Sequence, residues 1–114
     1  MKRVGMTWQI DPAHWKEYKD IHLNPWPELL AAIQAAGIHN YSIFAFPQCH
    51  PQGGVRVFAY LEVDGDDVYQ AFNAIAQTDI KKKWDAEVTI WVLPEAAEGC
   101  GVQFLELEPI FYCP

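Results

Sequence analysis

The chain has few basic residues and few cysteines, and it lacks any long hydrophobic run. Eight lysines and arginines stand against 15 acidic residues, which gives a formal net charge of −7. Nucleic acids and anionic membranes attract basic proteins, so neither is an expected partner. Phosphorylated or acidic substrates are disfavoured for the same reason, and a neutral ligand fits best. No apolar run reaches the length of a transmembrane helix.

The cysteines also argue against a secreted, disulfide-bonded protein. Cys49, Cys100 and Cys113 are odd in number and lack paired spacing, which is typical of reduced thiols in the cytosol. The opening Met-Lys-Arg is followed by an alternating segment rather than by the apolar core of a signal peptide. We therefore predict a cytoplasmic protein.

Motifs for metal ions and phosphates are missing as well. The sequence has no C-x-x-C or H-E-x-x-H spacing and no glycine-rich phosphate loop. The neighbouring Cys49 and His50 lie in a loop rich in glycine and proline, where such a pair is most often solvated. The run Lys81-Lys82-Lys83 is most simply a solvated helix face. We predict no metal site and no phosphate site.

Apolar and aromatic residues are plentiful, at 51% and 14%, which excludes a disordered chain. Without a repeat or a linker, residues 1–114 are predicted to form one domain. Hydrophobic periodicity, proline and glycine predict the elements. These are strands over 4–10, 38–46 and 55–63, a helix from Pro12 through His22, one from Pro27 to Gly37, one over 68–76, a short one from Asp79, an ambiguous segment over 87–93, and one or two strands within 102–113.

This order of strands and helices predicts an α+β fold of the ferredoxin-like sandwich type. Its sheet is antiparallel, and its helices lie on one face. The other face of such a sheet needs a cover, and a two-fold partner is the usual solution. We therefore expect a homodimer.

The segment from Tyr18 to Glu28 carries the strongest functional signal. Tyr18 and His22 lie four residues apart on the predicted helix and so share a face, and Trp26 follows at the next bend as a flat apolar wall. Opening a cyclic hemiacetal needs a proton delivered to the ring oxygen and another removed from the anomeric hydroxyl, without a cofactor. An imidazole can move protons near neutral pH. The pair fits a small sugar, although a histidine near a helix C-terminus is also favoured electrostatically.

Other aromatic residues are candidates for the same pocket. Strand alternation puts His39, Tyr41 and Ile43 on one face, so Tyr41 can reach a pocket, and core packing explains it equally well. Trp26 and Trp84 can stack on the apolar face of a pyranose, but large indoles on short helices usually belong to the core. Spacing alone leaves both explanations open.

Several short stretches, in order along nearly the whole chain, match one known family. They are Met6 to Pro12, Tyr18 with His22, Trp26 to Leu29, Gly37 to Ser42, Thr78-Asp79 with Trp84, and Ile110 to Pro114. In these stretches the chain resembles the L-rhamnose mutarotase family. The resemblance implies a dimeric α+β barrel that interconverts the α and β anomers of L-rhamnose without a cofactor. It also implies that His22 is the proton donor and that Tyr18, Tyr41 and Trp84 contact the sugar.

Two departures from the family bear on the choice of sugar. The family typically has a tandem tryptophan where this chain has Trp84-Asp85, so Asp85 would replace stacking on the sugar by hydrogen bonding. The loop over 46–55 is longer than the family leads us to expect. We predict an aldose mutarotase for L-rhamnose or a related sugar, with His22 as the general acid and Tyr18 and Tyr41 orienting the sugar.

Two other functions stay open. The chain could be a non-catalytic sugar-binding or dimeric interaction module that keeps the pocket without turnover. It could also catalyse a different reaction on the same barrel, since cofactor-free oxygenases and small-molecule decomposers share this architecture and fold alone does not decide function.

Overall fold

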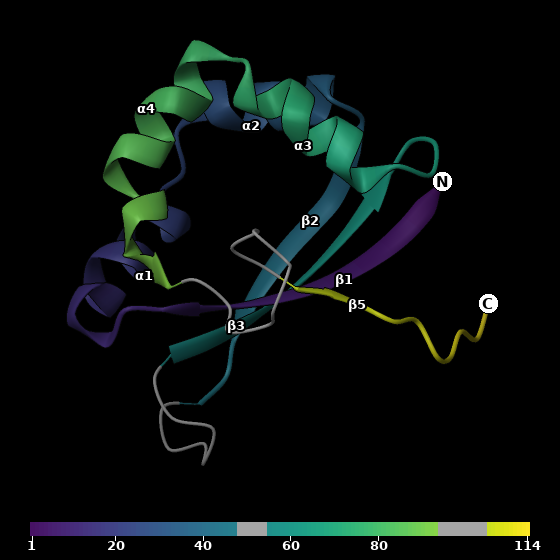
Figure 1. Ribbon diagram of the computed structural model, residues 1–114, viewed down its shortest axis with the longest axis horizontal. Helices are drawn as coiled ribbons and strands as arrows, with labels where there is room; N and C mark the ends of the chain where they lie inside the picture. The colour runs from purple at the N-terminus through teal and green to yellow at the C-terminus, as the bar shows by residue number, and fades with distance from the viewer. Residues whose placement is uncertain (48–54, 94–104) are drawn as a thin grey trace.

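The computed structural model describes residues 1–47, 55–93 and 105–114. They form an antiparallel, curved sheet with helices on one of its faces (Figure 1). The predictions about Cys49, His50, Cys100 and the long loop lie outside the described residues. The elements are β1 (Lys2–Ile10), α1 (Trp15–Leu23), α2 (Pro27–Ala35), β2 (Ile38–Ala45), β3 (Val55–Val63), α3 (Val68–Ala76), α4 (Asp79–Glu87), β4 (Val92–Leu93) and β5 (Leu105–Leu107), with short 3-10 turns at Pro12–His14 and Thr89–Trp91.

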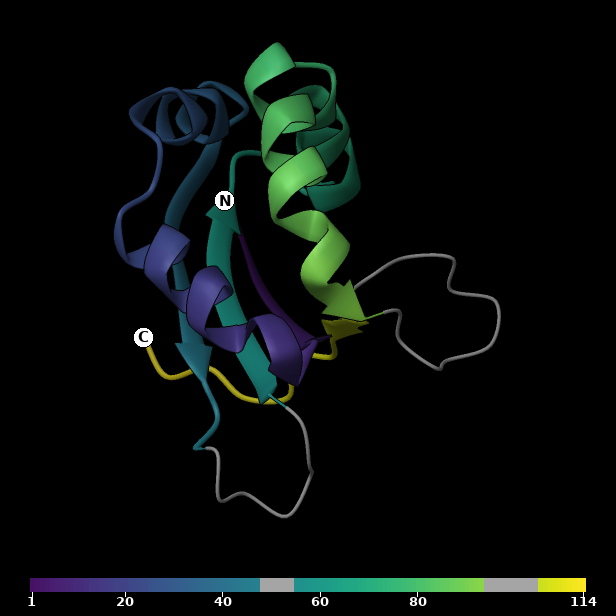
Figure 2. The same ribbon diagram turned by 90° about the vertical axis from the view of Figure 1, so that its left-hand side faces the viewer.

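The strand order is β2-β3-β1-β4, and β5 also pairs with β1. Helices α1 and α2 connect β1 to β2, while α3 and α4 connect β3 to β4, so each helical pair crosses over a strand that lies between. In Figure 2, α1 and α2 form one column of the helical layer, and α3 with α4 form another. This is the ferredoxin-like arrangement, and the predicted α+β fold is confirmed.

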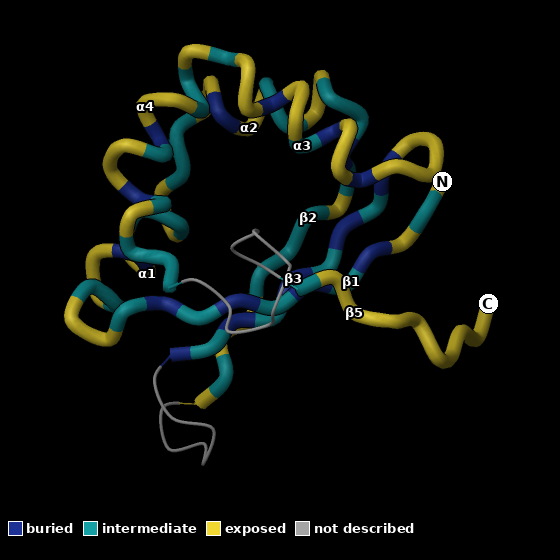
Figure 3. The backbone as a smooth tube through the Cα atoms, viewed as in Figure 1, coloured by how far each residue is buried: buried dark blue, intermediate teal, exposed yellow. Residues whose placement is uncertain are grey.

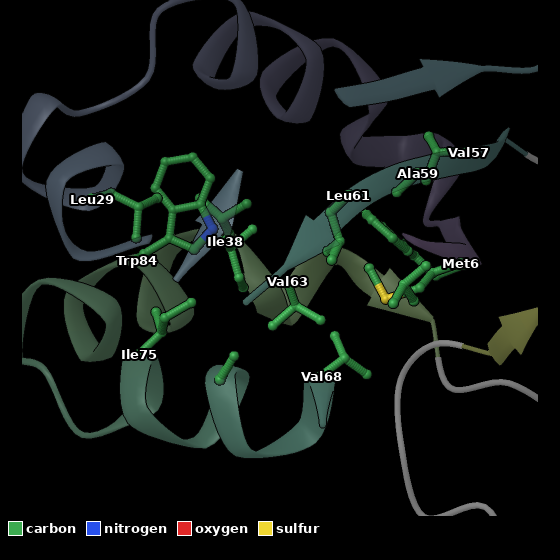
Figure 4. Close-up of a cluster of buried hydrophobic side chains, with 14 of the residues drawn as sticks. Met6, Leu29, Ile38, Val57, Ala59, Leu61, Val63, Val68, Ile75 and Trp84 are labelled. Carbon is green, nitrogen blue, oxygen red and sulfur yellow. The ribbon is translucent and has the colours of Figure 1, made fainter. Parts of the chain in front are cut away.

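The core lies between the sheet and the helices. Along β3 every second side chain is buried, from Val55 to Val63, and β1 repeats the pattern. The buried strand residues appear as a dark-blue stretch in Figure 3, and Figure 4 shows Ile38, Val63 and Val68 gathered between sheet and helices. Burying a large aliphatic side chain contributes roughly 1.5–3 kcal/mol, so this layer is a main source of stability.

The ends of the helices follow the local sequence signals. The Asp11 carboxylate accepts a hydrogen bond of 2.9 Å from the backbone N–H of Ala13, which starts the first turn. Trp26 is extended, with φ −69° and ψ 126°, because Pro27 follows it. Gly37 ends α2 with φ +85°, a conformation that glycine adopts without strain. These three predictions are confirmed.

The segment over 87–93 contains both of the structures that the sequence left open. The helix α4 ends at Glu87, a 3-10 turn follows, and β4 begins at Val92. All four α-helices contain nine residues, and in the described part of the chain no helix combines the length and apolar character needed to cross a bilayer.

A β-bulge in β2 breaks the predicted alternation. His39 pairs with Glu62 and Ser42 with Tyr60, so two residues of β2, Asn40 and Tyr41, lie opposite a single residue of β3. Asn40 has φ +51°, and its side-chain amide donates to Glu62 at 3.0 Å and 3.2 Å. The expectation that His39 and Tyr41 share a face is therefore wrong. The bulge turns Tyr41 to the same side as Ile38, toward the helices.

Replacing Asn40 by valine is expected to destabilise the protein, whereas replacing it by glycine is not. A β-branched residue in the left-handed region costs about 1–2 kcal/mol, and asparagine and glycine tolerate that region better. The free energy of unfolding in urea measures the difference. Equal stability of the two variants would show that the positive φ of Asn40 imposes no constraint.

Candidate active site

A cavity of about 1290 Å³ opens between the inner face of the sheet and the helices. Met6 and Trp8 of β1 and Val57 of β3 contribute its floor, and all four α-helices contribute to its walls. Most of the lining side chains are apolar, as in many small-molecule sites. The polar and charged residues that line it are Tyr18, Lys19, His22, Gln34, His39, Asn40, Tyr41, Lys81 and Thr89.

Tyr18 is fixed at the floor of the cavity by the strand beneath it. The indole Nε1–H of Trp8 donates a hydrogen bond of 2.9 Å to the hydroxyl oxygen of Tyr18, and both side chains are buried. Burial raises the pKa of the Tyr18 phenol to about 12, and the bond from Trp8 opposes part of that rise. The phenol is therefore neutral. Because its oxygen accepts from the indole, its own O–H is available to donate to a ligand.

His22 is oriented by the backbone of Tyr18. Its Nδ1 lies 2.7 Å from the carbonyl oxygen of Tyr18, and a carbonyl only accepts, so Nδ1 carries the hydrogen and donates it. The imidazole also lies against the Tyr18 ring, with centroids 4.0 Å apart, and meets Trp84 edge-on at 5.2 Å. The assigned tautomer leaves Nε2 as the nitrogen that can exchange a proton with a ligand.

The surroundings of His22 keep its ring neutral. Burial lowers the pKa of the imidazole below its ordinary 6.5, and the positive charge of Lys81 lowers it further, while the bond to the Tyr18 carbonyl acts in the opposite direction. At neutral pH the predominant form is therefore the uncharged ring. In that form Nε2 is a proton acceptor.

Tyr41 reaches the same cavity from the sheet. Its ring meets Phe72 of α3 at a centroid distance of 6.3 Å, which places it on the helical side of β2. Burial raises the pKa of its phenol, and the proximity of Tyr18 adds to the rise. The cavity thus brings together two neutral phenols and one imidazole from two different elements, as the sequence predicted.

Three tryptophans line the cavity, and a fourth, Trp26, supports one of them. Trp84 lines it, whereas Trp26 is not among the described residues that do and instead meets the Trp84 ring edge-on at 5.1 Å. Trp8 and Trp15 also line the cavity, and neither was predicted as a site residue. Trp15 was recognisable in principle, because it shares a helix face with Tyr18 and their rings lie 6.1 Å apart.

Asp85 does not have the place that the sequence suggested. It is absent from the described residues that line the cavity, and its Oδ1 accepts hydrogen bonds from Lys81 and from Thr89, the latter at 2.6 Å. Lys81 does line the cavity, so the interpretation of the lysine run as a solvated face is wrong for this residue. Lys82 and Lys83 are exposed, as expected.

Comparison with solved structures supports the same fold. An L-rhamnose mutarotase from Formosa agariphila aligns over all of both chains with a TM-score of 0.71 and 24% identity. The tetracenomycin F2 cyclase of Streptomyces glaucescens, a type-II polyketide cyclase, also aligns over all of both chains, with a TM-score of 0.67 and 15% identity. At these identities the likeness is one of fold alone.

Comparison of sequences identifies relatives that match over nearly the whole chain. The L-rhamnose mutarotase of Tolumonas auensis is 33% identical over 112 residues, which cover 98% of each chain. That of Escherichia coli is 32% identical over 114 residues, all of both chains. The family model described as L-rhamnose mutarotase matches residues 3–113. The chain belongs to the L-rhamnose mutarotase family.

Proposed function

We propose that this protein, acting as one domain over residues 1–114, interconverts the α and β anomers of L-rhamnose. One observation carries the proposal: the neutral imidazole of His22 faces the same cavity as the phenols of Tyr18 and Tyr41 and the ring of Trp84. Full-length relatives of the same family support it. A non-catalytic sugar-binding module is not favoured, because the tautomer of His22 leaves one ring nitrogen for proton transfer.

The mechanism needs a single proton carrier. Ring opening removes the proton of the anomeric hydroxyl, breaks the bond between the anomeric carbon and the ring oxygen, and protonates that oxygen. Both oxygens are bonded to the same carbon, so one nitrogen beside them can serve both transfers. Nε2 of His22 accepts the anomeric proton, and the imidazolium then delivers it to the ring oxygen as general acid. Rotation of the aldehyde and the reverse steps give the other anomer.

The remaining groups hold the sugar in place for that transfer. Tyr18 and Tyr41 keep their hydrogens because burial raises the pKa of both phenols, so each can donate to a sugar oxygen. The ring of Trp84 can cover an apolar face of the pyranose, and Trp26 keeps that ring in position. Holding the sugar in the reactive orientation lowers the free-energy barrier of the proton transfer.

Replacing His22 by alanine is expected to remove nearly all catalysed anomer exchange, because acid–base catalysis by a positioned side chain contributes about 10²–10⁴-fold. Saturation-transfer proton NMR measures exchange on L-rhamnose, with L-fucose, L-lyxose, L-mannose and D-glucose for comparison. His14→Ala is the matched control, since His14 stacks on Trp91 and is not among the described residues that line the cavity.

Equal exchange by His22→Ala and wild type would contradict the assignment of His22. Binding of L-rhamnose by wild type without faster exchange would support the sugar-binding module instead. Loss of a substrate that depends on oxygen would point to different chemistry on the same fold.

The pH dependence follows from the resting state of His22. Its pKa lies below 6.5, and the neutral ring is the form that accepts the anomeric proton. The value of kcat/KM is therefore expected to be constant above about pH 7 and to fall as the pH drops through the lowered pKa. A rate that rises as the pH falls would show that the imidazolium is the reactive resting form.

A second copy of the chain is the occupant we propose for the outer face of the sheet. The helices cover the inner face, and alternation along β3 turns Phe58 and Tyr60 outward. The C-terminal residues after β5 are exposed in Figure 3, including Phe111 at 84%, and Arg3 of β1 lies over the ring of Tyr112 at 3.5 Å. Apolar groups exposed together in this way mark an interface.

Sedimentation equilibrium is expected to give twice the mass of the 13.0 kDa chain. Phe111→Asp is expected to shift the equilibrium toward monomer, because a charge replaces an apolar contact. Ile90→Asp is the matched control, since Ile90 is 69% exposed and lies in the 3-10 turn between α4 and β4 rather than in the C-terminal segment. A monomeric wild type at all concentrations would refute the homodimer.

We also propose a cytoplasmic location. Among the described residues Cys113 is an exposed free thiol, and such a thiol persists most readily in a reducing compartment. The odd number of cysteines in the whole sequence agrees with this location.

A further inference from the structure

Lys81 differs from the two lysines that follow it. Its side chain is 24% exposed and lines the cavity, whereas Lys82 and Lys83 point to solvent. Trp84 lies three residues further along α4 and lines the cavity too, because residues at this spacing share a helix face. Lys81 therefore belongs to the same wall as the indole that meets His22.

Asp85 holds this ammonium group in place, and Thr89 in turn bonds to Asp85. The carboxylate of Asp85, four residues along the helix, accepts a hydrogen bond from Nζ of Lys81. The same oxygen accepts from the hydroxyl of Thr89 at 2.6 Å. An ammonium has three N–H donors, and Asp85 engages one of them. The cation is thus fixed at the cavity and keeps donors for a ligand.

The charges around the cavity make Lys81 unusual in this protein. The chain carries a net charge of −7, yet the charged side chains among the described lining residues are those of Lys19 and Lys81, with no carboxylate. Lys19 is exposed, so Lys81 is the better-buried cation of the two. Lys81 and His22 line the same cavity, and the positive charge of Lys81 lowers the pKa of His22.

We propose that Lys81, held by Asp85, is a second polar anchor of the sugar and donates a hydrogen bond to one of its hydroxyl oxygens. The proposal deepens the proposed function and rests on it. A hydroxyl oxygen accepts from an ammonium without carrying charge, so the anchor suits a neutral sugar. Asp85 then acts on the sugar through Lys81, as a positioning residue.

Loss of the anchor is expected to raise KM rather than to lower kcat. The proton transfer does not alter the hydroxyl that Lys81 binds, so the bond stabilises ground state and transition state alike. Lys81→Met is expected to raise KM and the dissociation constant for L-rhamnose roughly tenfold or more, with little change in kcat. Lys82→Met makes the same chemical change one residue away on the exposed side and is expected to leave both constants unchanged.

Two variants of Asp85 test the positioning role. Asp85→Asn keeps an oxygen that accepts from Lys81, whereas Asp85→Ala keeps none, so the alanine variant is expected to show the larger rise in KM. In Lys81→Met the fall of kcat/KM at acid pH is also expected to begin at a higher pH, because the positive charge that lowers the pKa of His22 is gone. The lining residues with titratable side chains are Tyr18, Lys19, Tyr41, Lys81 and His39, whose imidazole bonds to Asp64, and of these it is Lys81 whose charge acts on His22.

Isothermal titration of L-rhamnose beside saturation-transfer NMR separates this proposal from the proposed function. Sugar binding by wild type that Lys81→Met weakens supports the anchor even where exchange is not accelerated, a result that would refute only the mutarotase. Equal dissociation constants for Lys81→Met and Lys82→Met would overturn the anchor while leaving the mutarotase intact. Failure of wild type to bind L-rhamnose would overturn both.

Discussion

The hydrogen bond from the Trp8 indole to the Tyr18 hydroxyl is the contact on which the rest of the site depends. It joins the floor of the sheet to α1 inside the core, where an unpaired hydroxyl or indole N–H would be costly. It also decides which way the Tyr18 O–H can donate. The backbone carbonyl of Tyr18 then fixes the tautomer of His22, and the two rings lie against each other. One buried tyrosine thus sets the orientation of His22, the proposed proton carrier.

The second constraint is the bulge in β2, which reverses the direction of side chains in the middle of a strand. Ile38 packs into the core, and strict alternation from it would turn Tyr41 toward the outer face. The extra residue at Asn40 restores Tyr41 to the inner side. Alternation predicted that Tyr41 can reach a pocket, but for the wrong reason. A bulge depends on pairing with another strand, which the pattern of one strand does not reveal. The asparagine at position 40 was a local hint, because asparagine adopts a positive φ more readily than most residues.

Most of the fold was predictable because its signals are local. Alternation marks β1 and β3, and Pro27 and Gly37 mark the ends of α2. The wall of the cavity was less predictable. A run of three lysines says nothing about which lysine faces inward, since that depends on how α4 packs against α2 and α3. The place of Asp85 was equally hard to predict. Its carboxylate bonds to Lys81 and Thr89, four residues to either side, and Asp85 does not line the cavity.

The net charge of the chain did not predict the sign of the charges that line the cavity. The acidic surface argued for a neutral ligand, yet two lysines are the charged side chains among the described lining residues. The two facts are compatible because Lys81 is paired with Asp85, which does not line the cavity, so the proposed anchor is a hydrogen-bond donor that requires no anionic ligand. A second tryptophan at position 85 would leave Lys81 without this carboxylate, so under the two proposals the exchange of tryptophan for aspartate affects the binding of the sugar rather than the transfer of the proton.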